Sequence, residues 1–238
     1  MVADVDTPRV IPEPSLRRLP QYYQFLVRLA RADVRNVSCS QIGVELKFDP
    51  TQIRKDLAFT GINGKPNVGY GVTDLIRGIE DLLGWNNVKD AFLAGAGNLG
   101  AALLGYSGFK QRGLNIVAAF DIDPQKIGRQ VAGKHVLSLS KLSDLARRMH
   151  IHLGIIATPE NAAQSVAHLM VEGGIRAIWN FAPVHLKVPE NVIVQSESLE
   201  SSLGALSFKV EQALKAELGK GSTDNGREPG GGLAGEEI

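Results

Sequence analysis

Cysteine and long apolar runs are the features that this 238-residue sequence most lacks. Its single cysteine, Cys39, excludes an intrachain disulfide and is too few thiols for a metal site. No apolar run approaches the ~18 residues that span a bilayer. The polar start, MVADVDTPRVIPEPS, lacks the basic and then apolar pattern of a signal peptide. We therefore expect a cytoplasmic protein with no membrane segment.

A large net charge is also absent, because the formal charge is only +1. The charges are nevertheless unevenly distributed. Residues 15–70 hold nine Lys and Arg against four Asp and Glu, whereas residues 196–238 hold four against eight. A basic N-terminal block indicates a polyanionic partner, although an ordinary solvated surface explains the same imbalance.

The pattern along the chain divides it into four parts. Residues 15–84 show helical periodicity followed by a glycine-containing stretch, and residues 85–195 alternate apolar strands with helices. Residues 196–219 form one long amphipathic helix. The Gly-rich remainder, 220–238, has the composition of a disordered tail. We expect two domains, an extra helix and a tail.

The middle part has the pattern of an α/β fold with a parallel sheet. Its strand candidates are KDAFLAG, NIVAAFD, KHVLSL, HLGIIAT, AIWNFA and NVIVQS. Helical stretches separate most of them. Apolar strands that alternate with helices predict a parallel sheet covered on both faces.

The stretch FLAGAGNLGAAL contains the G-x-G-x-x-G pattern in the context of a dinucleotide fold. The pattern follows an apolar strand and opens a helix, and an aspartate ends the next strand 21 residues after the last glycine. The helix N-terminus favours phosphate, and the aspartate accepts hydrogen bonds from ribose, which favours NAD(H) over NADP(H). The expected contacts are Gly95, Ala96, Gly97, Asn98, Leu99, Gly100, Asp121, Ile122, Asp123 and Lys126.

Other strand ends should line the same crevice, because ligands bind at the carboxyl ends of parallel strands. These ends supply Thr158, Pro159, Asn180, Ala182 and Pro183, and Tyr106 at the end of the first helix is either a ligand contact or a core residue. None of these loops offers a general acid or base, and we identify no catalytic residue and no metal site. The segment that follows the fold is too short for a catalytic domain, so function should come from the N-terminal part.

The N-terminal part is consistent with a helix-turn-helix. An amphipathic helix at 20–32, with Pro20 in its first turn, precedes a capping box at 38–41 that opens a short helix to Leu46. Asp49 and Gln52 fit a second capping box at the start of a helix over 50–60. The sequence GINGKPNVGYG then fits a β-wing. Candidate DNA contacts are Ser38, Thr51, Gln52, Arg54, Lys55 and Lys65. By itself this segment also fits an exposed charged helix and a solvent-exposed hairpin.

Several of these motifs together resemble one family. IRKDLAFTG, AGAGNLGAAL, FDIDPQKIG, IIATPENAAQ and IWNFAPV, in this order between residues 16 and 209, are similar to the Rex family of redox-sensing transcriptional repressors. The resemblance implies a homodimer of winged-helix and Rossmann domains that binds a palindromic operator. It also implies that the C-terminal helix, 198–218 here, is exchanged between subunits, and that NADH binding releases the DNA.

Two positions depart from the family pattern. Pro66 stands in the wing where family members usually carry a basic residue, and Ser198 and Leu199 stand where some members carry an Asp-Phe pair linked to the switch. Glu197 or Glu200 is the alternative switch residue. Two other functions also fit the sequence: a small NAD-dependent oxidoreductase, and a CoA- or nucleotide-binding module of a larger enzyme.

Overall fold

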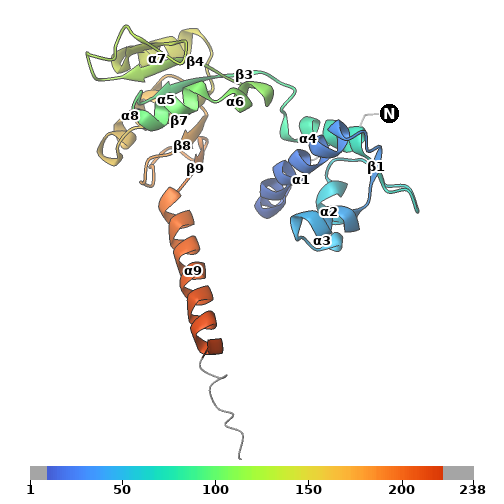
Figure 1. The fold of residues 1–238 in the computed structure, drawn as a ribbon. Coiled ribbons are helices and arrows are strands. Elements are labelled where there is room, and N and C mark those ends of the chain that lie inside the picture. Colours follow the sequence, from blue (N-terminus) through green and yellow to red (C-terminus); the bar gives the residue numbers. More distant parts are fainter. Residues whose placement is uncertain (1–9, 222–238) are drawn as a thin grey trace, which may run out of the picture.

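The computed structural model describes residues 10–221, which form two bodies and a projecting helix (Figure 1). The N-terminal body holds helices α1 (Glu13–Arg31), α2 (Cys39–Leu46), α3 (Pro50–Ala58) and α4 (Val72–Leu83), with a two-stranded antiparallel sheet of β1 (Asn36–Val37) and β2 (Tyr70–Gly71). Its core contains side chains from all four helices, including Leu19, Ile42, Ile53 and Leu75. Among the described residues, no helix is both long and apolar enough to cross a membrane.

Helix α1 begins earlier than the sequence suggested. Glu13 opens it and Pro20 lies inside it, so the prediction of Pro20 in the first turn was wrong. A proline inside a helix removes one backbone hydrogen bond. Leu19, Tyr22 and Leu26 are fully buried on the same helix, and this apolar packing outweighs the loss.

The second body is a seven-stranded α/β sheet in the strand order β5-β6-β4-β3-β7-β8-β9. Its strands are β3 (Lys89–Ala94), β4 (Leu114–Asp121), β5 (Gln130–Val131), β6 (Lys134–Ser138), β7 (Leu153–Ile156), β8 (Ala177–Asn180) and β9 (Ile193–Ser196). All neighbours are parallel except β5 and β6. The predicted α/β class and parallel sheet are confirmed.

Helices cover both faces of this sheet. One face packs under α5 (Asn98–Gly105) and α6 (Ser107–Gln111), and the other under α7 (Leu142–Arg148) and α8 (Glu160–Glu172), with a 3-10 turn at Leu139–Lys141. Successive β3 residues alternate between the two cores, because strand side chains point to opposite faces. The chain order reverses at β3, which pairs with both β4 and β7. A crevice at such a switch point is where α/β sheets bind ligands.

The last helix, α9 (Leu199–Gly221), projects away from the α/β body (Figure 1). The apolar residues expected to form a buried stripe are all about half exposed or more in the single chain: Leu199, Leu203, Leu206, Val210 and Leu214. The helix continues past residue 219, where the sequence suggested its end. The predicted disordered tail falls almost wholly on 222–238, outside the described residues.

Candidate functional sites

Helices α2 and α3 form a helix-turn-helix whose two caps are set by side chains. Ser38 accepts a hydrogen bond from the Gln41 amide at 3.1 Å, and the Gln41 side chain accepts one from the Ser38 amide at 2.8 Å, which confirms this capping box. Asp49 accepts from the amides of Thr51 and Gln52. The second capping box was wrong, because the Gln52 side chain does not return to Asp49.

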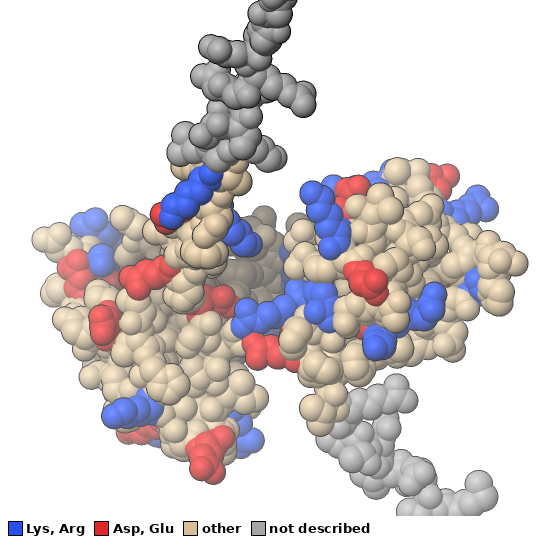
Figure 2. Space-filling model, turned by 90° about the horizontal axis from the view of Figure 1, so that it is seen from below, with Lys and Arg blue, Asp and Glu red and all other residues tan. Residues whose placement is uncertain are grey.

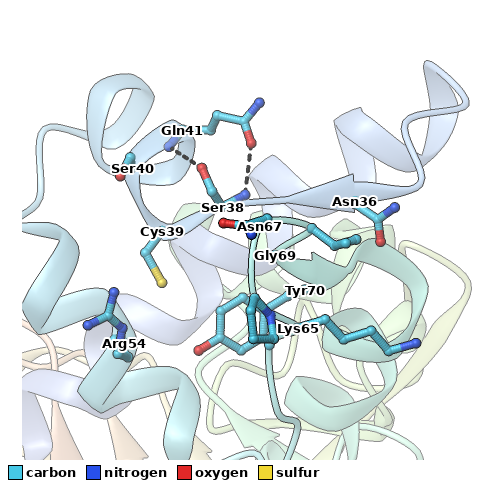
Figure 3. Close-up of a pocket in the computed structure, with 13 residues that line it drawn as sticks. Asn36, Ser38, Cys39, Ser40, Gln41, Arg54, Lys65, Asn67, Gly69 and Tyr70 are labelled. Carbon is cyan, nitrogen blue, oxygen red and sulfur yellow. Dashed lines mark hydrogen bonds between the residues drawn. The ribbon is translucent and has the colours of Figure 1, made fainter.

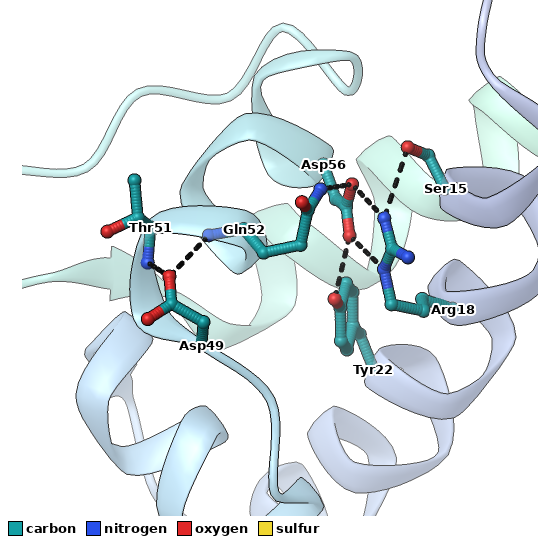
Figure 4. A network of polar contacts seen from close by, with 7 residues as sticks. All are labelled: Ser15, Arg18, Tyr22, Asp49, Thr51, Gln52 and Asp56. Atoms are coloured by element: carbon teal, nitrogen blue, oxygen red, sulfur yellow. Dashed lines mark hydrogen bonds and ion pairs between the residues drawn. The ribbon is translucent and has the colours of Figure 1, made fainter.

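Gln52 instead donates to Asp56, which lies at the centre of a buried polar network (Figure 4). Asp56 is fully buried and accepts two hydrogen bonds from Arg18, at 2.6 and 2.8 Å, and one from the Tyr22 hydroxyl at 2.8 Å. Burial alone would raise the pKa of Asp56, but hydrogen bonds, led by that from Arg18, hold this pKa below its usual value. The ionised carboxylate therefore fastens α3 to α1.

This anchoring turns the opposite face of α3 outward. Thr51, Arg54 and Lys55 are exposed, whereas Gln52 is half-buried. The polar types on the exposed face suit base edges and phosphates. Sequence reasoning missed Asp56, although RKDL contains it, because an aspartate in a charged run is indistinguishable from a surface residue.

A cleft of about 700 Å³ lies between α2, α3 and the wing (Figure 3). Ser38, the N-cap of α2, and Gln41 in α2 line it on one side, Arg54 lines it from α3, and Lys65 from the wing. The wing is a tight hairpin in which Lys65 and Gly69 exchange two backbone hydrogen bonds, of 2.8 and 2.9 Å. The structure thus brings together candidate residues that are 27 positions apart, with Pro66 exposed in the hairpin tip.

The glycine-rich loop at the end of β3 leaves space beside a helix N-terminus. Gly95 has φ of 98°, and a Cβ there would lie 2.5 Å from the Ala157 carbonyl oxygen; a Cβ on Gly100 would overlap the Gly95 carbonyl. Close packing against the backbone therefore requires glycine at both positions. Nothing lies near the Cβ position of Gly97, the N-cap of α5. A side chain there would fill the space in which a phosphate approaches the helix.

Asp121 ends β4 and is 9% exposed. Its carboxylate accepts from the amides of Ala96 and Asp123, both at 2.9 Å, and from Lys126 Nζ at 3.1 Å. Burial would raise the pKa of Asp121, but these hydrogen bonds outweigh it, so this pKa lies below its usual value. The acceptor expected for ribose is therefore charged and fixed in place.

A pocket of about 330 Å³ opens between these elements at the switch point. The Thr158 hydroxyl is buried and has no hydrogen-bond partner among the described residues. Such a group needs a partner, and a bound polar ligand supplies one. The predicted contacts in the lining are Gly95, Gly97, Asp121, Ile122, Asp123, Lys126, Thr158 and Pro159. The residues and the dinucleotide fit each other.

Leu139, Ala162 and Val166 also line this pocket and were missed by sequence reasoning. They supply an apolar wall suited to a flat ring. The helical spacing of Ala162 and Val166 in α8 was visible in the sequence, but such spacing indicates a core residue as readily as a pocket residue.

Several predicted contacts lie elsewhere. The side chain of Asn180 is fully buried and bonds to the backbone of Ala182 and Val184, so it braces its own loop instead of facing the pocket. Ala182 is buried and Pro183 is exposed outside the lining.

Other predicted contacts around α5 also lie outside the pocket lining. The Ala96 side chain is buried, while Asn98 and Leu99 are exposed on α5. Tyr106 is 56% exposed between α5 and α6, which excludes the core alternative in this chain.

Two family models match the two bodies separately. "Putative DNA-binding protein N-terminus" matches residues 10–58, and "CoA binding domain" matches residues 86–184.

Curated relatives match across both bodies. The redox-sensing transcriptional repressor Rex of Treponema denticola is 46% identical, over 81% of this chain and 92% of its own. That of Desulforamulus reducens is 42% identical, over 86% of this chain and 97% of its own.

Solved structures agree with these matches. The Rex-family repressor RSP, in complex with NAD⁺ and operator DNA, aligns with a TM-score of 0.81 at 33% identity, covering 90% of this chain and 99% of that one. RSP in complex with NADH aligns with a TM-score of 0.79.

Proposed function

The chain belongs to the Rex family of redox-sensing transcriptional repressors, and from this premise we propose that it binds a palindromic operator and releases it when NADH binds. One observation carries the proposal: a single chain combines a preformed pocket at a Rossmann switch point with a separate helix-turn-helix. In this account the dinucleotide acts as a regulatory ligand and not as a redox cosubstrate. The cytoplasm, where operator DNA lies, is the site of action.

Residues 85–195 hold the dinucleotide in this account. The Gly95–Gly100 loop and the start of α5 bind the pyrophosphate, and Asp121 binds the adenosine ribose. The orphaned Thr158 hydroxyl is the best-supported further contact. When bound, NAD(H) supplies a nicotinamide whose charge depends on its redox state.

The charge difference between the two redox states gives the selectivity. NAD⁺ carries a cationic ring and NADH a neutral one, and burial of an unpaired charge is costly. Tyr106, Phe109, Trp179 and Phe181 form a continuous row of aromatic contacts with ring centroids 4.8 to 5.4 Å apart. We assign Tyr106 and Phe181 to an apolar surface that favours the neutral ring.

Residues 15–84 bind the DNA. The exposed Thr51, Arg54 and Lys55 face the major groove, and Lys65 in the wing contacts the backbone or the minor groove. Ser38, whose hydroxyl already caps α2, lies where a phosphate approaches the cleft.

A palindromic operator requires two copies of the recognition helix, and α9 supplies the dimer contact. Its apolar residues are exposed to solvent within the part of the chain that the structure describes. Exchange of α9 between two subunits buries them and leaves NADH to shift the dimer between DNA-competent and DNA-incompetent states.

Two variants test whether DNA binding and NADH binding belong to separate domains. We expect Arg54→Ala to abolish operator binding and leave NADH affinity unchanged, and Asp121→Ala to weaken NADH binding while the cofactor-free protein still binds the operator. Fluorescence anisotropy measures the first property and calorimetry the second. Loss of both properties in either variant contradicts the proposal. Thermal stabilisation by CoA but not by NADH would replace the sensor with a CoA-binding module.

A further inference from the structure

Arg112 lies where the two bodies meet. It follows α6 in the α/β body, and its guanidinium carbon is 5.3 Å from the ring centroid of Trp85 and 5.9 Å from that of Tyr23 in α1. Trp85 and Tyr23 pack edge to face at 5.0 Å, and the Tyr23 hydroxyl donates to Glu80 at 2.8 Å. Cations within about 6 Å of such rings are attracted to their faces.

The same guanidinium also holds α6. Arg112 Nη1 donates to the Gly108 carbonyl oxygen at 3.2 Å. A Cβ on Gly108 would lie 2.6 Å from the Tyr106 ring, so that ring rests directly on the α6 backbone. A continuous path of contacts therefore runs from Tyr106 through Gly108 and Arg112 to α1.

We propose that Arg112 is the positioning residue that transmits the state of the dinucleotide pocket to the DNA-binding body of the same subunit. The inference rests on the proposed function, in which Tyr106 borders the nicotinamide. A displacement of Tyr106 shifts the five-residue α6 beneath it. That shift moves the guanidinium relative to the two rings and so alters how α1 sits against the α/β body.

The next step in the path is rigid. Helix α1 is fastened to the recognition helix through Arg18 and Asp56, with donor–acceptor distances of 2.6 and 2.8 Å. A movement of α1 is therefore transmitted to α3 through charge-assisted hydrogen bonds, which are stronger than hydrogen bonds between neutral groups.

The contact also has room to move. A groove of about 560 Å³ runs along one side of it, lined by Gln21, Gln24, Gln111 and Arg112 among others. Lys and Arg side chains are visible where the two bodies meet in Figure 2. Most of the residues that line this groove are glutamines or arginines, whose side chains can stay solvated as the two bodies shift.

The test compares Arg112→Gln with a matched control, Lys110→Gln, which removes the same charge from an exposed position of α6. The quantity measured is the coupling ratio, the operator Kd with saturating NADH divided by the Kd without cofactor. We expect Arg112→Gln to lower this ratio by about tenfold, because operator binding in saturating NADH tightens, while the cofactor-free operator Kd and the NADH Kd of the DNA-free protein change little. Lys110→Gln should leave the ratio unchanged. Arg112→Lys, which keeps the cation, should restore part of the ratio.

A coupling ratio in Arg112→Gln equal to that of the parent would overturn the inference. So would an equal loss in Lys110→Gln. Addition of Tyr23→Leu to Arg112→Gln should lower the ratio no further, since both act on one contact; additive losses count against the path. Absence of NADH release in the parent protein would instead mean that the proposed function has failed.

Discussion

Asp56 illustrates how one buried charge positions a functional surface. It accepts hydrogen bonds from Arg18, Tyr22 and Gln52, and none of these partners lies on the exposed face of α3. Removal of one member of a buried ion pair leaves the other charge uncompensated. The carboxylate therefore matters to DNA binding through the orientation of α3 and not through contact.

We expect Asp56→Ala to lower the free energy of unfolding by about 3 kcal/mol, because Arg18 and the Tyr22 hydroxyl lose their partner in a buried site. Urea unfolding followed by circular dichroism measures the change. The control is Asp144→Ala, which removes an exposed pair with Arg148 and should cost below about 1 kcal/mol. Equal losses in the two variants would contradict the anchoring role.

The lowered pKa of Asp56 also predicts a pH dependence. A carboxylate whose folded pKa lies below its usual 3.8 stabilises the fold fully above that value and loses the contribution as pH falls through the folded pKa. Asp56→Asn should therefore unfold with a weaker dependence on pH below 3.8 than the parent. Acid titrations of both proteins that superimpose would contradict this.

At the scale of elements, the sequence predicted those parts whose pattern is carried by many residues. The central strands β3, β4 and β7 were found because parallel strands buried on both faces are continuous apolar runs. Helix α6 was missed because five residues show no periodicity. Pro20 misplaced the start of α1, since a proline marks a helix start more often than an interior.

The candidate site shows the same limit. Spacing along the chain predicted Gly97 and Asp121 at the pocket, because a fixed loop geometry determines both. Asn180 could not be predicted, because an amide that follows a strand is equally able to face a ligand or to brace its own loop. Only the three-dimensional contacts of Asn180 distinguish these roles.

The wing carries a proline, Pro66, where the family resemblance leads us to expect a basic residue. Pro66 is exposed in the tip and has no N–H to donate. We expect Pro66→Arg to tighten operator binding severalfold. The slope of log affinity against log salt concentration should steepen by the amount expected for about one added phosphate contact. Pro66→Gln controls for loss of the proline ring. Identical operator affinities for the arginine and glutamine variants would show that the tip does not reach the DNA.

At the scale of the whole molecule, the account requires two chains. Helix α9 projects with Leu206 58% exposed and Leu214 55% exposed. A stripe of this kind on a helix that leaves its own domain is suited to burial against a second copy.

We expect Leu206→Glu to convert the dimer to a monomer, because the introduced charge would be buried in the contact. Gln212→Glu, on the far side of the helix from Leu203, should leave the dimer intact. Sedimentation velocity distinguishes the two states, and the monomer should bind a full palindrome more weakly than the parent. A dimer that persists in Leu206→Glu would place the subunit contact elsewhere.

The most direct test of the account is an anisotropy titration of a palindromic, A/T-rich operator probe with this protein, at one stated salt concentration. Three titrations are compared: without cofactor, with NAD⁺ and with NADH. The account predicts tight binding in the first two and a loss of affinity of at least about tenfold with NADH. Tight binding that NADH leaves unchanged would contradict it, because the pocket would then be formed without being coupled to the DNA-binding face.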